Sequence, residues 1–411
     1  MSGTAGRNSG KTASTCADAG GRLKIIHVFR APLGGLFRHV LDLTRAQCAA
    51  GHQVGIVADS MTGGERADAI FRELAPQLAL GVTRMPMHRN PHPSDALNLV
   101  RMQKLFGEKQ PHVVHGHGSK GGLYARTPAL FAAGSGSVRA YTPHGGSFNY
   151  KPGSAIHSLY MATESVLART TDLFLFESAF IQSCFTKYVH APNAYTRVIP
   201  NGISPAEFIP VVPDADAADF LYVGELRQAK GIDTLIDAHR QFEQRSGRPI
   251  RSILVGTGPD KEKLEARAAG LGLGSRISFP GAMPAREAFR RGHTLIVPSR
   301  AESLPYIVLE AAAASIPMIS TSVGGIPEIY GPYSQRLIAC NNVDVLAGAM
   351  LAHDAKTAAA RAREAAELSD YVASRFTIDH MVEAVIAGYR DAMARKLTGA
   401  SASPVPAAVA S

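Results

Sequence analysis

The stretch LIVPSRAESLPYIVLEAAAASIPMIST, residues 295–321, predicts a strand, a loop, a helix and a second strand in that order. The apolar run at 295–298 ends at a proline, and a short polar loop at 299–304 follows it. A helix is expected from Pro305, because proline suits the first helical turn. A strand at 318–321 then completes a βαβ unit, which places two parallel strands in one sheet with a helix covering it.

The same rhythm of short apolar runs and longer helical patterns extends along most of the chain. It predicts an α/β protein with two doubly wound Rossmann-like domains that face each other across a cleft. Helices are expected at 36–50 and 94–109, among others. Strands are expected at 23–29, 53–58, 82–86, 113–115, 138–142, 172–176, 196–199, 220–223, 253–255, 277–279, 295–298 and 318–321.

A stretch rich in Pro and Asp interrupts this rhythm and predicts a linker at 205–219. One domain is therefore expected at 22–204 and a second at 220–376. The last helical pattern, 377–396, is expected to return to the first domain. Residues 1–21 and 397–411, which are mostly small and polar, are predicted to be disordered tails.

Composition excludes several classes of protein. With 45% hydrophobic and 19% charged residues, the chain of 411 residues is neither disordered throughout nor collagen-like. The longest mostly apolar stretch, 304–319, contains Glu310 and two prolines, so no transmembrane helix is expected. The N-terminal tail has no apolar core, so no secretory signal and a cytoplasmic location are expected. Four scattered cysteines, Cys16, Cys48, Cys184 and Cys340, argue against a disulfide framework or a zinc site built on cysteines.

Charge is unevenly distributed along the chain. Residues 1–200 contain 21 Lys and Arg against 11 Asp and Glu, whereas residues 201–411 contain 22 against 23, so the first part carries +10 and the second −1. The first domain is therefore expected to attract an anionic partner, such as a phosphorylated acceptor or an acidic membrane surface. Nucleic acid is not expected as a partner, because the basic residues are dispersed and form no aromatic-interleaved cluster.

Two carboxylates stand out in the opening stretch. Glu302 falls in the loop at the carboxyl end of a strand, and Glu310 lies in an otherwise apolar helix. An acid in an apolar helix face is unfavourable unless it has polar partners. The stretch E-S-L-P-Y-I-V-L-E, 302–310, resembles the Glu-x7-Glu motif of retaining glycosyltransferases of family 4, which have the GT-B fold.

Other motifs occur in the order of that family, over roughly 23–395. They are Gly34-Gly35 in the first turn, His144 in T-P-H-G-G, P-N-G-I at 200–203, G-E-L-R-Q-A-K-G at 224–231 and V-G-T-G-P at 255–259. The resemblance implies that the domain at 22–204 binds the acceptor and the domain at 220–376 binds the nucleotide sugar. It further implies that Glu310 holds the ribose of a nucleotide, that Glu302 meets hydroxyls of the donor sugar, and that His144 contacts the sugar or its phosphate. It also implies donor binding by Gly34, Gly35, Gly224, Gly256, Ser303 and Leu304.

Lys230 and Arg227 are the cations expected to hold the diphosphate, because they precede a helix that begins near Gly231. Members of the family commonly carry a basic residue directly after the equivalent of Gly224, where this chain has Glu225. Arg227 lies two residues further along an extended loop, points to the same side, and is expected to replace it. Pro305 stands where the family often has glycine, and it has no amide hydrogen to donate to phosphate.

The H-x-H pair His115 and His117 lies at another strand end. Metal ligation is one interpretation, but no third ligand has a clear spacing, so a role lining the cleft is favoured over a metal site. For each of the other site residues considered alone, the alternative to a binding role is an ordinary residue of a loop or of the solvent-exposed surface.

Together these features predict sugar transfer from a nucleotide diphosphate donor to a saccharide or lipid-linked acceptor, with retention of configuration. No essential metal and no cofactor are expected, because protein cations stabilise the leaving diphosphate. A non-catalytic nucleotide-sugar binder of the same fold remains an alternative. A nicotinamide-dependent oxidoreductase is disfavoured despite Asp59 at a strand end, because no G-x-G-x-x-G turn follows a strand: Gly256-x-Gly258 continues to Lys261.

Overall fold

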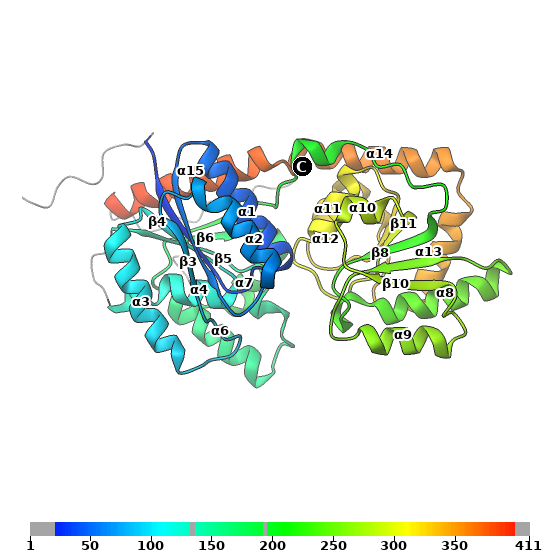
Figure 1. Ribbon diagram of the computed structural model, residues 1–411, viewed down its shortest axis with the longest axis horizontal. Coiled ribbons are helices and arrows are strands. Elements are labelled where there is room, and N and C mark those ends of the chain that lie inside the picture. The colour runs from blue at the N-terminus through cyan, green and yellow to red at the C-terminus, as the bar shows by residue number, and fades with distance from the viewer. Residues whose placement is uncertain (1–20, 132–135, 192–194, 399–411) are drawn as a thin grey trace, which may run out of the picture.

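A computed structural model describes residues 21–131, 136–191 and 195–398 and divides them into two α/β lobes (Figure 1). Residues 1–20 and 399–411, most of the two predicted disordered tails, lie outside the described residues. Within these ranges all strand pairs are parallel, as expected for βαβ units. The chain is therefore an α/β protein with two Rossmann-like lobes, as the sequence predicted.

The first lobe is built on a sheet in the order β3-β2-β1-β4-β5-β6-β7. Its strands are β1 (Lys24–Phe29), β2 (Gln53–Asp59), β3 (Gly81–Met85), β4 (Val113–His117), β5 (Val138–Thr142), β6 (Leu173–Phe176) and β7 (Thr196–Val198). Its helices are α1 (Gly34–Ala49), α2 (Gly64–Leu74), α3 (Ser94–Lys109), α4 (Gly118–Arg126), α5 (Pro128–Phe131), α6 (Ala155–Ala168) and α7 (Ala179–Tyr188). Short 3-10 turns are η1 (Ala75–Gln77) and η2 (Ser147–Asn149).

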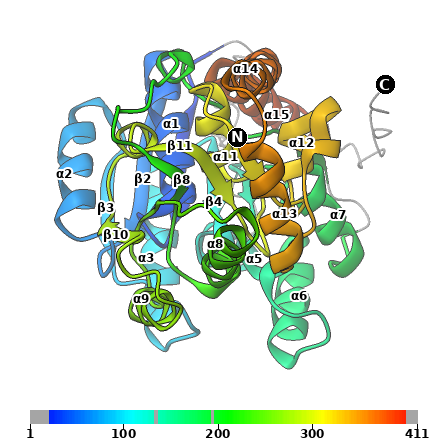
Figure 2. The same ribbon diagram turned by 90° about the vertical axis from the view of Figure 1, so that its right-hand side faces the viewer.

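The second lobe has a sheet in the order β10-β9-β8-β11-β12. Its strands are β8 (Ala218–Val223), β9 (Ser252–Val255), β10 (Ile277–Gly281), β11 (Gly292–Val297) and β12 (Met318–Ser320). Its helices are α8 (Ile232–Ser246), α9 (Lys261–Gly270), α10 (Ala285–Phe289), α11 (Tyr306–Ala313), α12 (Ile326–Tyr330), α13 (Val343–Asp354) and α14 (Ala358–Arg375), with 3-10 turns η4 (Gln228–Lys230) and η5 (Gly331–Arg336). Helices α8 and α13 lie side by side on one face of this sheet (Figure 2).

The region between the lobes differs in detail from the expected linker at 205–219. It contains the 3-10 turn η3 (Pro205–Phe208), in which Ser204 and Glu207 form a capping box. β8 already begins at Ala218, so the last part of the expected linker is strand. The acid- and proline-rich composition masked this start, because strand β8 opens with small and acidic residues.

Helix α15 (Ile378–Thr398) returns the chain to the first lobe (Figure 1). Its buried side chains, including Met381, Val385 and Tyr389, join a core with Ile25 of β1 and Leu173 of β6. The helix extends two residues beyond 396, so 397 and 398 are helical, and the expected tail begins later.

The chain thus passes between the lobes twice, and the two passages touch. The amide of Ile203 donates to the carbonyl oxygen of Phe376 at 2.7 Å, and the amide of Ile378 donates to the carbonyl oxygen of Ile203 at 3.1 Å. Gly202 makes this approach possible, because a Cβ there would lie 2.5 Å from the carbonyl oxygen of Thr377. The two passages are therefore joined as a short parallel bridge.

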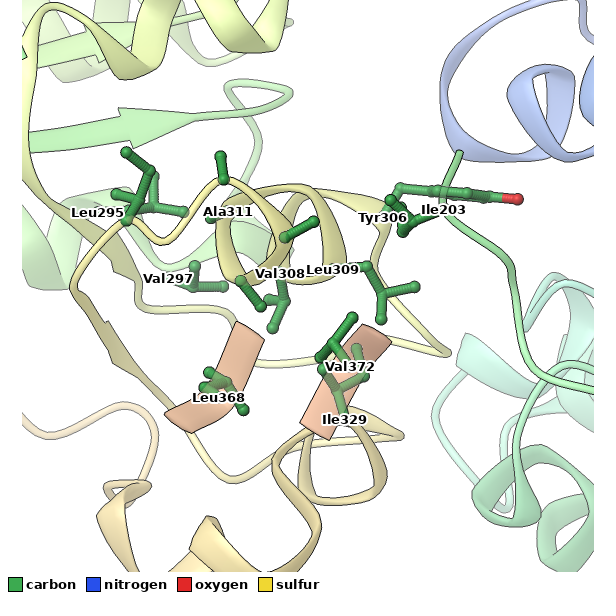
Figure 3. Close-up of a cluster of buried hydrophobic side chains, with 14 of the residues drawn as sticks. Ile203, Leu295, Val297, Tyr306, Val308, Leu309, Ala311, Ile329, Leu368 and Val372 are labelled. Atoms are coloured by element: carbon green, nitrogen blue, oxygen red, sulfur yellow. The ribbon is translucent and has the colours of Figure 1, made fainter. Parts of the chain in front are cut away.

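Apolar burial explains why the opening stretch folds as the sequence predicted. Leu295 and Val297 of β11, Val308 and Leu309 of α11 and Val372 of α14 belong to one buried cluster, in which Val372 lies near Leu309 (Figure 3). Burying each such side chain contributes roughly 1.5–3 kcal/mol. Among the described residues, no helix is both long and apolar enough to span a bilayer.

Candidate active site

A cavity of about 700 Å³ lies between the lobes, at the carboxyl ends of both sheets. Parallel sheets commonly bind ligands at this edge. Most site residues predicted from the sequence line it: Gly34, Gly35 and His144 from the first lobe, and Gly224, Arg227, Lys230, Glu302, Ser303, Leu304 and Glu310 from the second. Gly256 does not line it, and the prediction that His115 and His117 line the cleft was wrong, because both are buried in the first lobe at the end of β4. The structure therefore brings together residues from motifs that are far apart in the sequence.

Gly256 lies beneath the cavity and is absent from its lining. Its φ is +149°, and a Cβ there would lie 1.8 Å from the carbonyl oxygen of Gly224. A residue with a side chain would push the end of β8 away from β9. Gly256 therefore acts on the cavity through the backbone of Gly224, and not by direct contact as expected.

Glu302 and Lys230 form an ion pair inside the cavity. Lys230 Nζ lies 2.6 Å from Glu302 Oε1, and the Ser299 hydroxyl donates to the same oxygen at 2.7 Å. Lys230 ends the turn η4, and Gly231 caps α8 directly after it. A cation and a carboxylate this close suit a ligand that presents a phosphate and a hydroxyl next to each other.

Arg227 also lines the cavity, but it is more exposed and already paired. Its Nε lies 2.9 Å from Glu225 Oε2, and the two side chains are 45% and 53% exposed. Glu225, which stands where the family commonly has a basic residue, therefore forms an ion pair with Arg227, the residue expected to replace that missing cation. Such an exposed pair stabilises the protein little, so Arg227 can exchange Glu225 for an anionic ligand.

Arg38, on α1, was missed by the sequence analysis although it lines the cavity. Its guanidinium donates to the carboxylates of Glu310 and Glu207, and it stacks 4.5 Å from the centre of the Tyr306 ring. Burial acts to lower the pKa of Arg38, but the charges of Glu310, Glu207 and Asp42 outweigh burial and raise it. Arg38 therefore stays charged and ties the first lobe to the second.

Glu310 consequently meets a partner in the structure, as its apolar surroundings required. Burial raises its pKa, and the charge of Arg38 opposes that change. The Tyr306 ring extends from the core of the second lobe toward the first lobe (Figure 3), where its hydroxyl lies 3.5 Å from His39 Nδ1. This end of the cavity is therefore closed by contacts between the two lobes.

Five histidines cluster in the first lobe below the cavity: His27, His39, His115, His117 and His144. His144 has a φ of +52°, an unusual conformation for a residue with a side chain. Burial lowers the pKa of His27 and His39 to about 4, and it lowers the pKa values of the other three well below 6.5. All five are therefore neutral at pH 7.

Glu177, directly after β6, is a second residue that the sequence analysis missed. It is buried, and neither carboxylate oxygen makes a well-formed hydrogen bond to a described residue. Burial raises its pKa to about 7, although the amides of Glu177 and His144 and the Ser303 side chain are close enough to oppose this. Its only sequence signal was an acid directly after an apolar strand.

The two lobes match two different glycosyltransferase families. Residues 33–207 match Glycosyltransferase Family 4, and residues 206–367 match Glycosyl transferases group 1. Among curated proteins, glycogen synthase of Mycobacterium tuberculosis is 27% identical over 323 residues, which cover 72% of this chain and 76% of that protein.

Two solved structures share the fold. Sucrose-phosphate synthase from Thermosynechococcus elongatus has a TM-score of 0.74 at 20% identity, covering 91% of this chain and 100% of that one. Anabaena HepE, solved in complex with UDP-glucose, has a TM-score of 0.71 at 17% identity, covering 92% of this chain and 100% of that one. With a family 4 domain, a group 1 domain and this two-lobed architecture, the chain is a glycosyltransferase of the GT-B fold.

Proposed function

We propose that this glycosyltransferase moves a hexose from a nucleotide diphosphate sugar to a saccharide or lipid-linked saccharide, with retention of configuration and no essential metal. The observation that carries the proposal is the contact between Lys230 and Glu302 in the cavity. In such a donor the β-phosphate is bonded to the anomeric carbon, so an anionic group lies next to the hydroxyls of the sugar ring, and this pair offers a partner to each.

Lys230 has the central role in this mechanism. Negative charge develops on the β-phosphate as the glycosidic bond breaks, so a cation stabilises the transition state more than the ground state. Arg227 adds a second positive charge once it leaves Glu225. Each charge-assisted hydrogen bond contributes roughly 1.5–3 kcal/mol, so two of them account for several powers of ten in rate.

Backbone amides support the same step. The amides of Ser303, Leu304 and Tyr306 donate no hydrogen bond within the described part of the chain, so they are available to the departing phosphate. Pro305 offers none. The acceptor hydroxyl attacks from the face that the diphosphate leaves, and the diphosphate takes its proton, which preserves the configuration without a protein nucleophile.

The remaining residues position the donor. Glu302 accepts from sugar hydroxyls, and His144 contacts the sugar or its phosphate from the opposite lobe. Glu310 accepts from the ribose hydroxyls while Arg38 keeps its two hydrogen bonds to Glu207, at 2.6 and 2.7 Å. Gly34 and Gly35 let the backbone of α1 approach the ligand closely. The UDP-glucose complex of the HepE protein supports a uridine nucleotide as the donor.

The acceptor is proposed from charge. The +10 excess in residues 1–200 favours an anionic acceptor, such as a lipid-linked pyrophosphate sugar in cell-surface polysaccharide synthesis, reached from the cytoplasmic face of an acidic membrane. Sedimentation with vesicles at low salt tests the membrane part. Equal binding to neutral and acidic vesicles would remove it.

The enzymatic part is tested by a panel of UDP-, GDP- and ADP-sugars. One nucleotide sugar is expected to raise the melting temperature and to be consumed, and NMR of the product is expected to show the anomeric configuration of the donor. The alternative of a non-catalytic binder predicts the same stabilisation without consumption of any donor. Absence of stabilisation by every nucleotide sugar contradicts the proposal.

A further inference from the structure

The histidine cluster carries more nitrogen ligands than donor binding uses. Two triplets have ligand atoms within 4.8 Å of one another: His27, His115 and His117, and His39, His117 and His144. The first triplet is fully buried, whereas His144 in the second lines the cavity. The spacing of His115 and His117 in the sequence indicated no third ligand. The fold brings further histidines to this pair: His27 from β1, His39 from α1 and His144 from the loop after β5.

The proton on His39 is fixed by its neighbours. Asn201 Nδ2 donates to the carbonyl oxygen of Leu304 at 2.9 Å, so the other amide atom, Oδ1, is an acceptor. His39 Nδ1 lies 3.0 Å from this oxygen and must carry the proton. Because the ring is neutral, Nε2 carries the lone pair. Within the described residues, His39 Nε2 has no hydrogen-bond partner.

A chain of hydrogen bonds fixes His117 in the same way. His27 Nε2 lies 2.8 Å from Gln47 Oε1 and donates to it, so His27 Nδ1 is an acceptor. His117 Nε2 lies 3.0 Å from His27 Nδ1 and is therefore the protonated nitrogen. The lone pair of His117 is on Nδ1, which lies 3.1 Å from His144 Nε2.

The all-buried triplet is poorer, because both nitrogens of His115 are already in use. His115 Nδ1 lies 2.7 Å from the Tyr389 hydroxyl, and Nε2 lies 2.9 Å from the Thr142 hydroxyl. A metal there would break one of these bonds in a closed core. The second triplet keeps the hydrogen bonds of His39 Nδ1 to Asn201 and of His117 Nε2 to His27, and it breaks only the bond between His117 Nδ1 and His144 Nε2, which lies next to the cavity.

We propose that His39 Nε2, His117 Nδ1 and His144 Nε2 bind a divalent transition metal of the zinc class, with the fourth position open toward the cavity. Three neutral imidazoles with one open position are a common zinc arrangement. Metal-binding histidines usually donate their other N–H to a fixed acceptor. Asn201 and His27 already provide such acceptors for His39 and His117.

Binding of the metal changes the tautomer of His144. In the metal-free state its Nε2–H donates to His117 Nδ1, and its Nδ1 is an acceptor. In the metal-bound state the Nε2 lone pair binds the metal, and the proton moves to Nδ1 through solvent, so no net proton is released. His144 then loses the acceptor that the donor sugar uses. This consequence rests on the proposed function and makes the metal an inhibitor.

Equilibrium dialysis of the full chain tests the site directly. After treatment with EDTA, the protein is dialysed against Zn²⁺, and bound zinc is measured by mass spectrometry. One zinc per chain is expected, with affinity lowered at least 100-fold in H117N and in H39Q. His88 and His92 stack at the surface with ring centres 3.8 Å apart, so all variants carry H92N to remove binding there.

H115N is the matched control, because His115 lies in the same cluster but outside the proposed triplet. It is expected to retain zinc within a few-fold of the parent. Circular dichroism identifies a variant that fails to fold, and X-ray absorption of the zinc-loaded parent, expected to show three imidazole nitrogens, then provides a measurement without mutation. No bound zinc in the parent, or equal loss in H115N and H117N, overturns the proposal.

Zinc is also expected to slow sugar transfer in the parent but not in H39Q, and EDTA is expected to restore the rate. If the protein transfers no sugar, dialysis still decides the metal site. If zinc does not bind, the donor panel still decides the activity. The two proposals therefore fail separately.

Discussion

The two walls of the cavity are built from different chemistry. Five uncharged histidines form a hydrogen-bonded cluster behind the wall from the first lobe, and His144 brings this neutral cluster to the cavity. The wall from the second lobe is ionic, with Lys230 paired to Glu302 and Arg227 paired to Glu225. The first lobe also places charged side chains of α1 and α2 at the cavity, namely Arg38, Asp42, Arg45 and Arg66, and Arg38 pairs with Glu310 of the second lobe.

This difference separates two tasks in the proposed reaction. The buried histidines keep a fixed geometry because their pKa values lie well below 7 and their charge does not change near pH 7, so they can hold His144 in place to orient a sugar. Ion pairs with partial exposure can exchange partners at little cost, so the second wall can accept the phosphate charge as it develops. The comparison predicts that removing a cation from the ionic wall affects rate more than stability.

The largest expected effect is on Lys230→Ala. Loss of this cation is expected to lower kcat/KM by about 100- to 1,000-fold, since a single donor to a developing oxyanion is worth roughly 3–4 kcal/mol. Turnover with the nucleotide sugar found in the panel measures it. Lys263→Ala, an exposed lysine of α9 outside the cavity, is the control. A similar loss in both variants, or near-normal activity in Lys230→Ala, would contradict the division between the walls.

The ionic wall was also the part that the sequence revealed best. Glu302, Glu310 and Lys230 occur in compact motifs, so their relation to strand ends could be read locally. Arg38 and Glu177 could not be found in this way, because their importance comes from partners over a hundred residues away, such as Glu310 for Arg38. Local spacing carries no information on such contacts.

The histidine wall shows the same limit. His115 and His117 lie two residues apart on one strand, so the sequence revealed this pair, but it did not reveal a third ligand. His27 reaches them because β1 and β4 are adjacent in the sheet, a pairing that the strand pattern alone does not specify. The fold class, in contrast, depends on the repeated βαβ pattern and was predictable throughout the described chain.

Glu177 provides a pH test of the neutral wall. Burial raises its pKa from 4.5 to about 7, so the carboxylic acid form is favoured in the folded state. Its contribution to stability is therefore full below about pH 4.5 and is lost as the pH rises through 7. Between pH 5 and pH 8 the parent is expected to lose roughly 2.5 kcal/mol of unfolding free energy that Glu177→Gln does not lose.

Urea unfolding at the two pH values measures this difference. Glu65→Gln, at an exposed position at the start of α2, is the control and is expected to follow the parent. If Glu177→Gln shows the same pH dependence as the parent, the carboxyl group is ionised throughout, and the first wall is not neutral there.

The smallest expected effect is on stability, and it concerns the ion pairs that Arg38 of the first lobe forms with Glu207 and Glu310. Arg38→Met keeps an apolar side chain over Tyr306 but leaves Glu310 and Glu207 without their cation. The loss of unfolding free energy is expected to be about 1.5 kcal/mol, less than for a fully buried pair because the Arg38 side chain is 23% exposed. Urea unfolding measures it at pH 7.

Arg45→Met on the same helix is the matched comparison. Its ion pair with Glu73 is long, at 3.4 Å, and both side chains are more exposed, so a change under about 0.5 kcal/mol is expected. Equal losses in the two variants would mean that the contact from Arg38 to the second lobe adds nothing to stability.

The doubled passage of the chain between the lobes limits how the enzyme can open. A single connecting segment would let one lobe rotate freely relative to the other. Two segments that are hydrogen-bonded at Ile203 and lie close together at Gly202 act as a hinge with one axis. Such a joint permits swinging about one line and resists rotation about the connecting segments. If the lobes close about this line during turnover, as we expect for an enzyme whose site is built from two lobes, Lys230 and His144 meet each substrate in the same alignment.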